Sequence, residues 1–323
     1  MILGWLRSRS APDVEIAAAI ERVIDSVDPR LRLASGCRKR LASPAARALE
    51  FARELVAGLP EPLVLRAGTW SGDAQLRAFF ATAQDVRDIV SRGPEPRRFF
   101  EEPGAPRDDA CAILGMTRKQ QTVLTQALEG DSVRRDVPRV SVSFTDHRLA
   151  SPSATEPELR RELEGRVLDF IAARVAARLG ELDERRKALE HERDVLKARL
   201  RLAGSGAKGV ETATGEGELA AKLATNDARL REAQAALGSL DDRVALLAQT
   251  LEAPEKEVAV AVHTLRLDQM NFVADAGPEA AAVTFVEATA AGGETSRVLV
   301  PVRVFRSELA PKGAALADAE RYL

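Results

Sequence analysis

His147 lies in a segment whose residue types could support acid–base chemistry. It follows Asp146 directly, after an alternating run in which Ser141, Ser143 and Thr145 share one side. Adjacent side chains of a regular strand point to opposite faces, so Asp146 could not orient His147 as the acid of a catalytic triad does. The hydroxyl groups would share the face of His147. We therefore predict a solvated sheet face, and a hydrolase centred on His147 is the third functional hypothesis.

A second candidate for chemistry is Cys37, because Arg38, Lys39 and Arg40 follow it. Neighbouring cations lower the pKa of a thiol, so a reactive cysteine is the alternative to the plain free thiol that we expect. Cys111 lies in an apolar stretch that we interpret as helical and packed. Two separate cysteines make neither a disulfide framework nor a zinc site, which favours a reducing, cytoplasmic compartment.

Three further patterns have ordinary interpretations. Gly204, Gly206 and Gly209 match the spacing G-x-G-x-x-G, but a helical pattern precedes them where a dinucleotide site requires a strand, so we predict a flexible turn. His191 lies in a charged run typical of a solvated helix face. We expect His263, in an alternating segment, to be partly buried and hydrogen-bonded. The sequence predicts no catalytic residue, no metal site and no cofactor.

Short basic clusters raise the question of nucleic-acid binding, which is the second functional hypothesis. The clusters are Arg38–Arg40, Arg97 and Arg98, Arg134 and Arg135, and Arg185–Lys187. Acidic residues lie near each cluster and the net charge of the chain is -2, so nucleic acid is not the partner that we expect. No apolar run approaches the ~18 residues of a membrane-spanning helix, so no membrane partner is expected either.

The strongest pattern is a pair of heptad repeats, which predicts helices over about 157–203 and 217–253 joined by a glycine-rich tip at 204–217. A connection of this kind favours an antiparallel coiled-coil hairpin. We predict that its seam contains the interaction residues, which are Leu168, Val175, Leu179, Leu182, Arg186, Leu189, Arg193, Leu196, Leu223, Leu230, Leu237, Leu240, Val244, Leu247 and Leu251. The two arginines indicate that one side of the seam is open to water.

The predicted fold class is α+β. We expect a helical N-terminal domain over 1–137, a small antiparallel sheet from 138–155 and 255–309, the hairpin at 156–254 inserted between its strands, and a C-terminal tail at 310–323. Alternating residues place strands at about 139–147, 258–263, 283–289 and 298–305. Pro301 would place the last strand at a sheet edge or create a bulge.

These features favour a non-enzymatic, cytoplasmic interaction or scaffold protein. The projecting hairpin would present its seam either to an unidentified protein partner or to a second copy of the chain, which would make a homo-oligomer. The nucleic-acid hypothesis would instead use the arginine clusters of the N-terminal domain. Heptads alone select no pathway and no partner.

Overall fold

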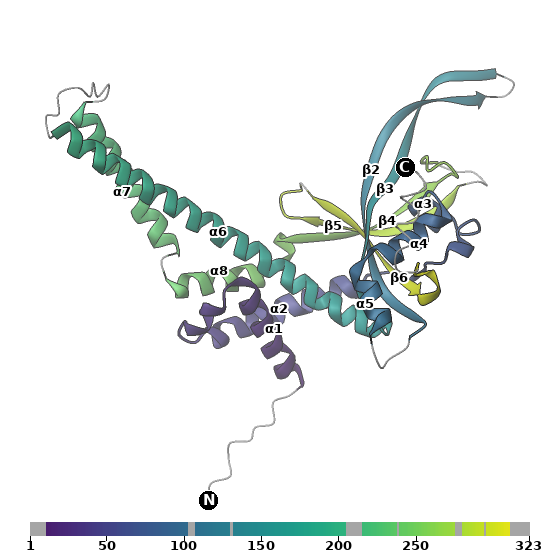
Figure 1. Cartoon of the computed structure of the whole chain (residues 1–323), viewed down its shortest axis with the longest axis horizontal. Helices are drawn as coiled ribbons and strands as arrows, with labels where there is room; N and C mark the ends of the chain where they lie inside the picture. The colour runs from purple at the N-terminus through teal and green to yellow at the C-terminus, as the bar shows by residue number, and fades with distance from the viewer. Residues whose placement is uncertain are drawn as a thin grey trace, which may run out of the picture. The chain divides into compact units, whose positions relative to one another are not determined.

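The computed structural model describes residues 11–102, 107–129, 132–204, 215–237, 239–274, 280–293 and 295–310. The chain divides into two compact units (Figure 1). The first unit contains Met1–Phe51 and Arg166–Glu257, and the second contains Ala52–Gly165 and Val258–Leu323. These units differ from the domains predicted above, because they share the 1–137 segment between them and divide the first long helix.

The second unit is built on one sheet. Its strands are β1 (Leu63–Val64), β2 (Asp109–Glu129), β3 (Ser132–Ser153), β4 (Val258–Leu267), β5 (Ala281–Ala290) and β6 (Ser296–Phe305). The order is β3-β2-β6-β5-β4 with antiparallel neighbours, and β1 pairs with β6 in parallel. The predicted α+β class and the insertion of a long helix between β3 and β4 are therefore confirmed, and the segment 139–147 shares a sheet with the later strands.

Three short helices pack on this sheet. They are α3 (Ala74–Phe79), α4 (Ala83–Arg92) and α5 (Pro94–Glu101); the 3-10 turn Ala67–Thr69 precedes α3, and the 3-10 turn Arg306–Glu308 follows β6. Asp73 caps α3, and Thr82 with Asp85 forms a capping box on α4. Phe79 packs edge-on against Phe144 of β3, whose ring meets Phe285 of β5 in the same way. These contacts belong to one buried apolar core.

The prediction of a helical stretch around Cys111 is wrong, because this residue lies in β2. β2 runs between β3 and β6, and consecutive residues from Ala110 to Leu114 are all buried. A strand covered on both faces does not alternate, so its sequence cannot be distinguished from a buried helix by periodicity. The edge position expected for Pro301 is also wrong: β6 is central, and Pro301 lies between its last pair with β5 at Leu299 and its first pair with β1 at Val302.

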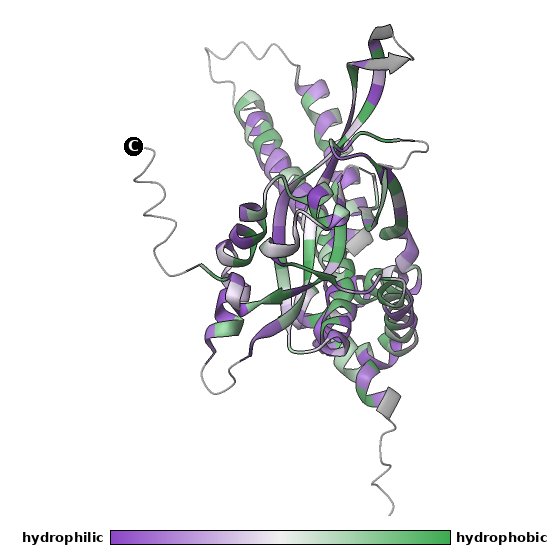
Figure 2. Cartoon of the chain, turned by 90° about the vertical axis from the view of Figure 1, so that its right-hand side faces the viewer, coloured by the Kyte–Doolittle hydropathy of each residue, from purple (hydrophilic) through white to green (hydrophobic). Residues whose placement is uncertain are grey.

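The first unit is helical. It contains α1 (Ala11–Val27), a 3-10 turn (Pro29–Leu33), the larger part of α2 (Cys37–Ala57), most of α6 (Glu156–Gly204), α7 (Glu216–Leu237), α8 (Leu240–Glu252) and the turn Pro254–Lys256. Hydrophobic and hydrophilic residues alternate along these helices (Figure 2). Ile24, Leu41, Val175 and Leu247 are fully buried in a core that α1, α2, α6 and α8 share.

The second long helix of the prediction consists of two helices. α7 ends at Leu237 and α8 begins at Leu240, where Ser239 is the N-cap and forms a capping box with Asp242. The heptad leucines continue across this break, so the hydrophobic period alone does not reveal it. The Ser-x-x-Asp pattern was the available signal.

The seam residues differ in what covers them. Six are buried in the core with the N-terminal helices, namely Leu168, Val175, Leu179, Val244, Leu247 and Leu251. Leu189, Leu196 and Leu230 are buried outside that core, whereas Leu182, Arg186, Arg193, Leu223 and Leu240 are half-buried. The side chain of Leu237 lies outside the described residues. Knobs-into-holes packing between α6 and α7 stays a prediction.

We expect Leu247→Ala to lower the free energy of unfolding by about 2–5 kcal/mol, because it leaves a cavity in a fully buried site. Leu202→Ala is the matched control: Leu202 lies on α6 but is 57% exposed, so its truncation should cost under about 0.5 kcal/mol. Urea denaturation followed by far-UV circular dichroism measures both. Equal losses would contradict the placement of Leu247 in the core.

Candidate functional site

A β-bulge positions His147 differently from the prediction. Gly115 of β2 pairs with Arg148 and Thr117 pairs with Thr145, so β3 contains one more residue than β2 in this interval. Asp146, with φ 54°, adopts the left-handed conformation that such a bulge uses. The extra residue reverses the alternation, so His147 does not lie with the serines but faces the aromatic core near Phe79.

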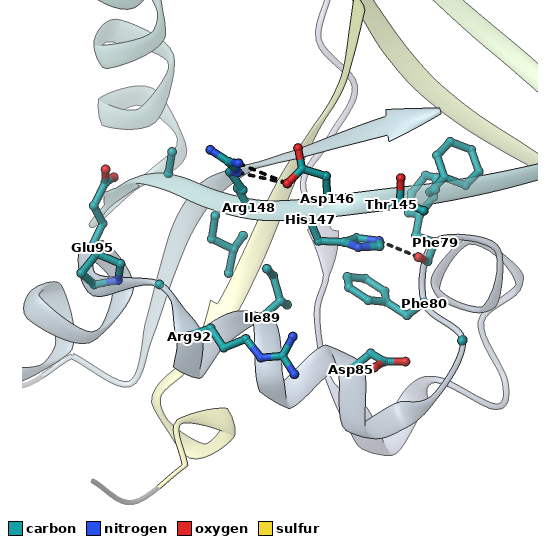
Figure 3. A pocket seen from close by; sticks show the side chains of 16 residues that line it. Phe79, Phe80, Asp85, Ile89, Arg92, Glu95, Thr145, Asp146, His147 and Arg148 are labelled. Atoms are coloured by element: carbon teal, nitrogen blue, oxygen red, sulfur yellow. Dashed lines mark hydrogen bonds and ion pairs between the residues drawn. The ribbon is translucent and has the colours of Figure 1, made fainter. Parts of the chain in front are cut away.

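The ring of His147 lies in a cavity of about 840 Å³ between β3 and α4 (Figure 3). Its walls are Phe144–Ala150 of β3, residues 79–81, three α4 side chains (Asp85, Ile89 and Arg92) and the Gly93–Glu95 segment. The His147 ring stacks on Phe80 with 4.9 Å between ring centroids and an interplanar angle of 24°. The lining combines apolar side chains with the charged side chains of Asp85, Arg92, Glu95, Asp146 and Arg148, and a volume of this size falls in the range of ligand pockets.

One ring nitrogen of His147 forms a hydrogen bond within the protein. Nε2 lies 2.7 Å from the carbonyl oxygen of Phe79, which can only accept a hydrogen bond, so Nε2 carries the proton and donates. Burial lowers the pKa of His147 below its ordinary value, although the Phe79 carbonyl acts in the opposite direction. The neutral ring therefore keeps Nδ1 as an acceptor.

Asp146 and Arg148 pair with each other away from the His147 ring (Figure 3). The Oδ2 atom of Asp146 also accepts a 2.5 Å hydrogen bond from Arg297, and this contact lowers the pKa of the Asp146 carboxyl. The carboxylate of Asp85, across the cavity, accepts hydrogen bonds from Thr82 in the capping box of α4. Among the described residues, the groups named in the hydrolase hypothesis do not assemble into nucleophile, base and acid.

The reactive-thiol alternative for Cys37 is not supported. The thiol is buried at the start of α2, and burial raises its pKa, while Arg40 and Arg38 act in the opposite direction. Burial likewise raises the pKa of the Cys111 thiol. Both cysteines are free thiols of a packed interior.

The basic clusters are largely neutralised by nearby acids. Arg38 donates to Glu21, and Arg40 donates to Asp241. Further pairs are Arg97 with Glu101, Lys187 with Glu184, and Arg186 with Asp183 and Glu190. Arg98 and Arg185 are exposed, and the side chains of Arg134 and Arg135 lie outside the described residues. These pairs offset much of the positive charge of the clusters that the structure describes.

The two remaining histidines are described by the structure, whereas most of the glycine-rich tip lies outside the described residues. His263 is half-buried, as expected, stacks on Phe285 and has its Nε2 atom 3.4 Å from Glu287. His191 is exposed on α6. Of the glycine-rich tip, Gly206 and Gly209 lie outside the described residues. Within the described part of the chain, no three His, Cys, Asp or Glu side chains are arranged to hold a metal ion.

Sequence reasoning missed most of the cavity. Phe79, Phe80 and Ile89 belong to helical stripes that identify core residues, and nothing in their pattern indicates that they line a cavity. Glu95 accepts a hydrogen bond from the backbone N–H of Ser151, which is a long-range contact without a sequence signature. The bulge could have been suspected only from Asp146, a residue type that tolerates positive φ.

Comparisons with protein families, curated proteins and solved structures found no match. None of the described helices combines the length and hydropathy that a membrane-spanning segment requires. The site therefore has to be interpreted from its own geometry.

We expect the free energy of unfolding to fall between about pH 7.5 and pH 5.5, in part because unfolded His147 binds protons more readily than the folded residue. A lowered histidine pKa in the folded state stabilises the fold at high pH, and this contribution is lost as pH falls below the unfolded pKa. His147→Phe, which keeps a ring against Phe80, should flatten this pH dependence. His191→Gln is the exposed control, and an unchanged slope in His147→Phe would contradict the assignment.

Proposed function

We propose that the protein is a non-enzymatic interaction protein of the cytoplasm, and that its distal hairpin docks on an acidic helical partner or on a second copy. The distal hairpin is defined as Leu182–Gly204 of α6 and Glu216–Leu237 of α7. Two buried free thiols agree with a reducing compartment. The main support for this proposal is a set of buried polar atoms without hydrogen-bond partners in the seam of this hairpin.

The core that includes α1 and α2 ends at Leu179 on α6, and on α8 it includes Val244, with Leu240 packed against it. From Leu182 to Gly204, α6 extends about 33 Å beyond this core, and Leu189, Leu196 and Leu230 are buried outside it. A hydrogen bond of 2.7 Å from Asn226 to Glu192 links α7 and α6. A two-helix segment leaves most of its circumference available to a partner.

The seam contains buried polar atoms that lack a hydrogen-bond partner in the described structure. They are the Nε atoms of Arg186 and Arg193 and the Oδ1 atom of Asn226. The nearest carboxylates approach the two arginines only to 3.5–3.9 Å, beyond hydrogen-bond distance. A buried, unsatisfied polar atom costs about 1–3 kcal/mol, so a partner that supplies acceptors to the two arginines would gain stability.

The chemistry of the partner follows from the arginine spacing. Arg186 and Arg193 are seven residues apart, which corresponds to about 10.5 Å along α6. Their side chains are 37% and 31% exposed, so the guanidinium groups are reachable from the edge of the seam. Carboxylates at heptad spacing on a partner helix would meet both, and charge-assisted hydrogen bonds of this kind are the stronger ones.

The test replaces both seam arginines by glutamate in the full-length chain. We expect Arg186→Glu with Arg193→Glu to reduce the partner recovered by in-cell crosslinking about tenfold or more, because carboxylates would then repel an acidic helix. If the partner is a second copy, light scattering should show a mass above that of a monomer which the variant lowers.

The matched control is Arg185→Glu with Arg199→Glu, which makes the same charge change at exposed positions of α6. Recovery should stay within about twofold in this control. Equal loss in both double variants, or a monomer that captures no protein, would overturn the proposal.

A further inference from the structure

The outer edge of β3 already accepts an extended segment of the chain. Val142 donates its backbone N–H to the carbonyl of Asn271, and Val273 donates to the carbonyl of Val140. The pairing is antiparallel, with Ser141 opposite Phe272. β3 is the outermost strand of the sheet order, so this short segment is strand addition at an edge.

The added segment leaves the edge where the cavity begins. At Asn271, φ is 60°, and the chain turns back to Asp268, whose backbone carbonyl accepts from the N–H of Asn271. Backbone groups of an antiparallel strand alternate between its two edges, so the N–H and C=O of Phe144 point outward as those of Val142 do. No described residue pairs with the backbone of Phe144 on this edge.

The far end of the open edge is closed by a side chain. Glu95 Oε2 accepts a 2.9 Å hydrogen bond from the backbone N–H of Ser151. Residues Phe144–Ala150 of β3 line the cavity. We name this cavity, with its open strand edge, the β3 groove.

The lining of the groove includes apolar side chains. Phe80, Ile89 and Leu149 line it and are almost completely buried beneath the surface, with exposed fractions of 2%, 8% and 6%. The Nδ1 atom of His147 is the acceptor within the same wall. Charges at the rim are of both signs, with Arg92 and Arg148 near Asp85 and Glu95, so net charge does not select the ligand.

We infer that the β3 groove binds an extended polypeptide segment of a partner protein. The segment continues the antiparallel pairing that Asn271–Val273 begins and inserts one apolar side chain against Phe80 and Ile89. Backbone hydrogen bonds supply affinity in this mode, and the side-chain cavity supplies selectivity. This interaction is separate from that of the distal hairpin, because it uses backbone groups of the sheet unit.

The probes are fluorescein-labelled, amidated heptapeptides of the pattern Thr-Val-Thr-X-Thr-Val-Thr, in which X is Phe, Leu, Tyr or Ser. Fluorescence anisotropy with the full-length protein gives the dissociation constants. We expect an apolar X to bind about tenfold or more tightly than Ser. We also expect the ring resonances of His147 and the amide of Phe144 to shift in NMR spectra.

Two controls separate strand addition from simple burial of an apolar group. Two peptides are compared, one N-methylated at the odd-numbered residues and one at the even-numbered residues. Only one of the two should bind about tenfold more weakly than the parent, because just one edge of the peptide would face β3. Ala81→Trp, at an exposed position that lines the groove, should weaken binding about tenfold, whereas Gln84→Trp, exposed on α4 outside the lining, should leave it within about twofold.

Three results would overturn the inference. The first is that no peptide binds at about 1 mM. The second is that both N-methylated peptides bind as well as the parent peptide. The third is that N-acetylphenylalanine amide binds as tightly as the peptide with Phe at X, which would indicate a small-molecule cavity.

Discussion

The bulge at Asp146 is the constraint on which the edge of the sheet depends. One extra residue in β3 turns His147 from the serine face to the aromatic core, and Arg297 holds the bulged carboxylate at 2.5 Å. Bulges commonly twist an edge strand out of pairing and protect it from uncontrolled association. Here the bulged residues Thr145–Arg148 also line the cavity, so the distortion and the cavity occupy the same part of the strand.

The helical unit distributes its hydrophobic residues in a different way. A single heptad seam has two surroundings: Val175 and Leu247 are buried in a core with the N-terminal helices, whereas Leu189 and Leu230 are buried outside that core. Leucine is sufficient in both places, because burial is non-directional. The polar residues Arg186, Arg193 and Asn226 lie only in the second part, where the two arginines are half-buried.

The features predicted from the sequence are those that repeat. Heptads located α6, and alternation located β4, β5 and β6, because these periods follow from backbone geometry. β2 was missed since a strand buried on both faces has no period of two, and the break before α8 was missed since the leucine spacing continues across it. His147 was placed on the wrong face because alternation assumes a regular strand, and one residue inserted into β3 reverses it.

The two proposed surfaces would respond differently to solution conditions. Arginine contacts of the distal hairpin are Coulombic and exposed at their outer ends, so added salt screens them over roughly 10 Å at about 0.1 M. The β3 groove relies on backbone hydrogen bonds and on burial against Phe80 and Ile89, which salt affects little. His147 adds acidity as a second variable, because protonation of Nδ1 would remove the acceptor inside the groove while leaving both arginines charged. Added salt should therefore weaken binding at the distal hairpin, and acid should weaken binding at the β3 groove. The two interactions can be distinguished by these two conditions.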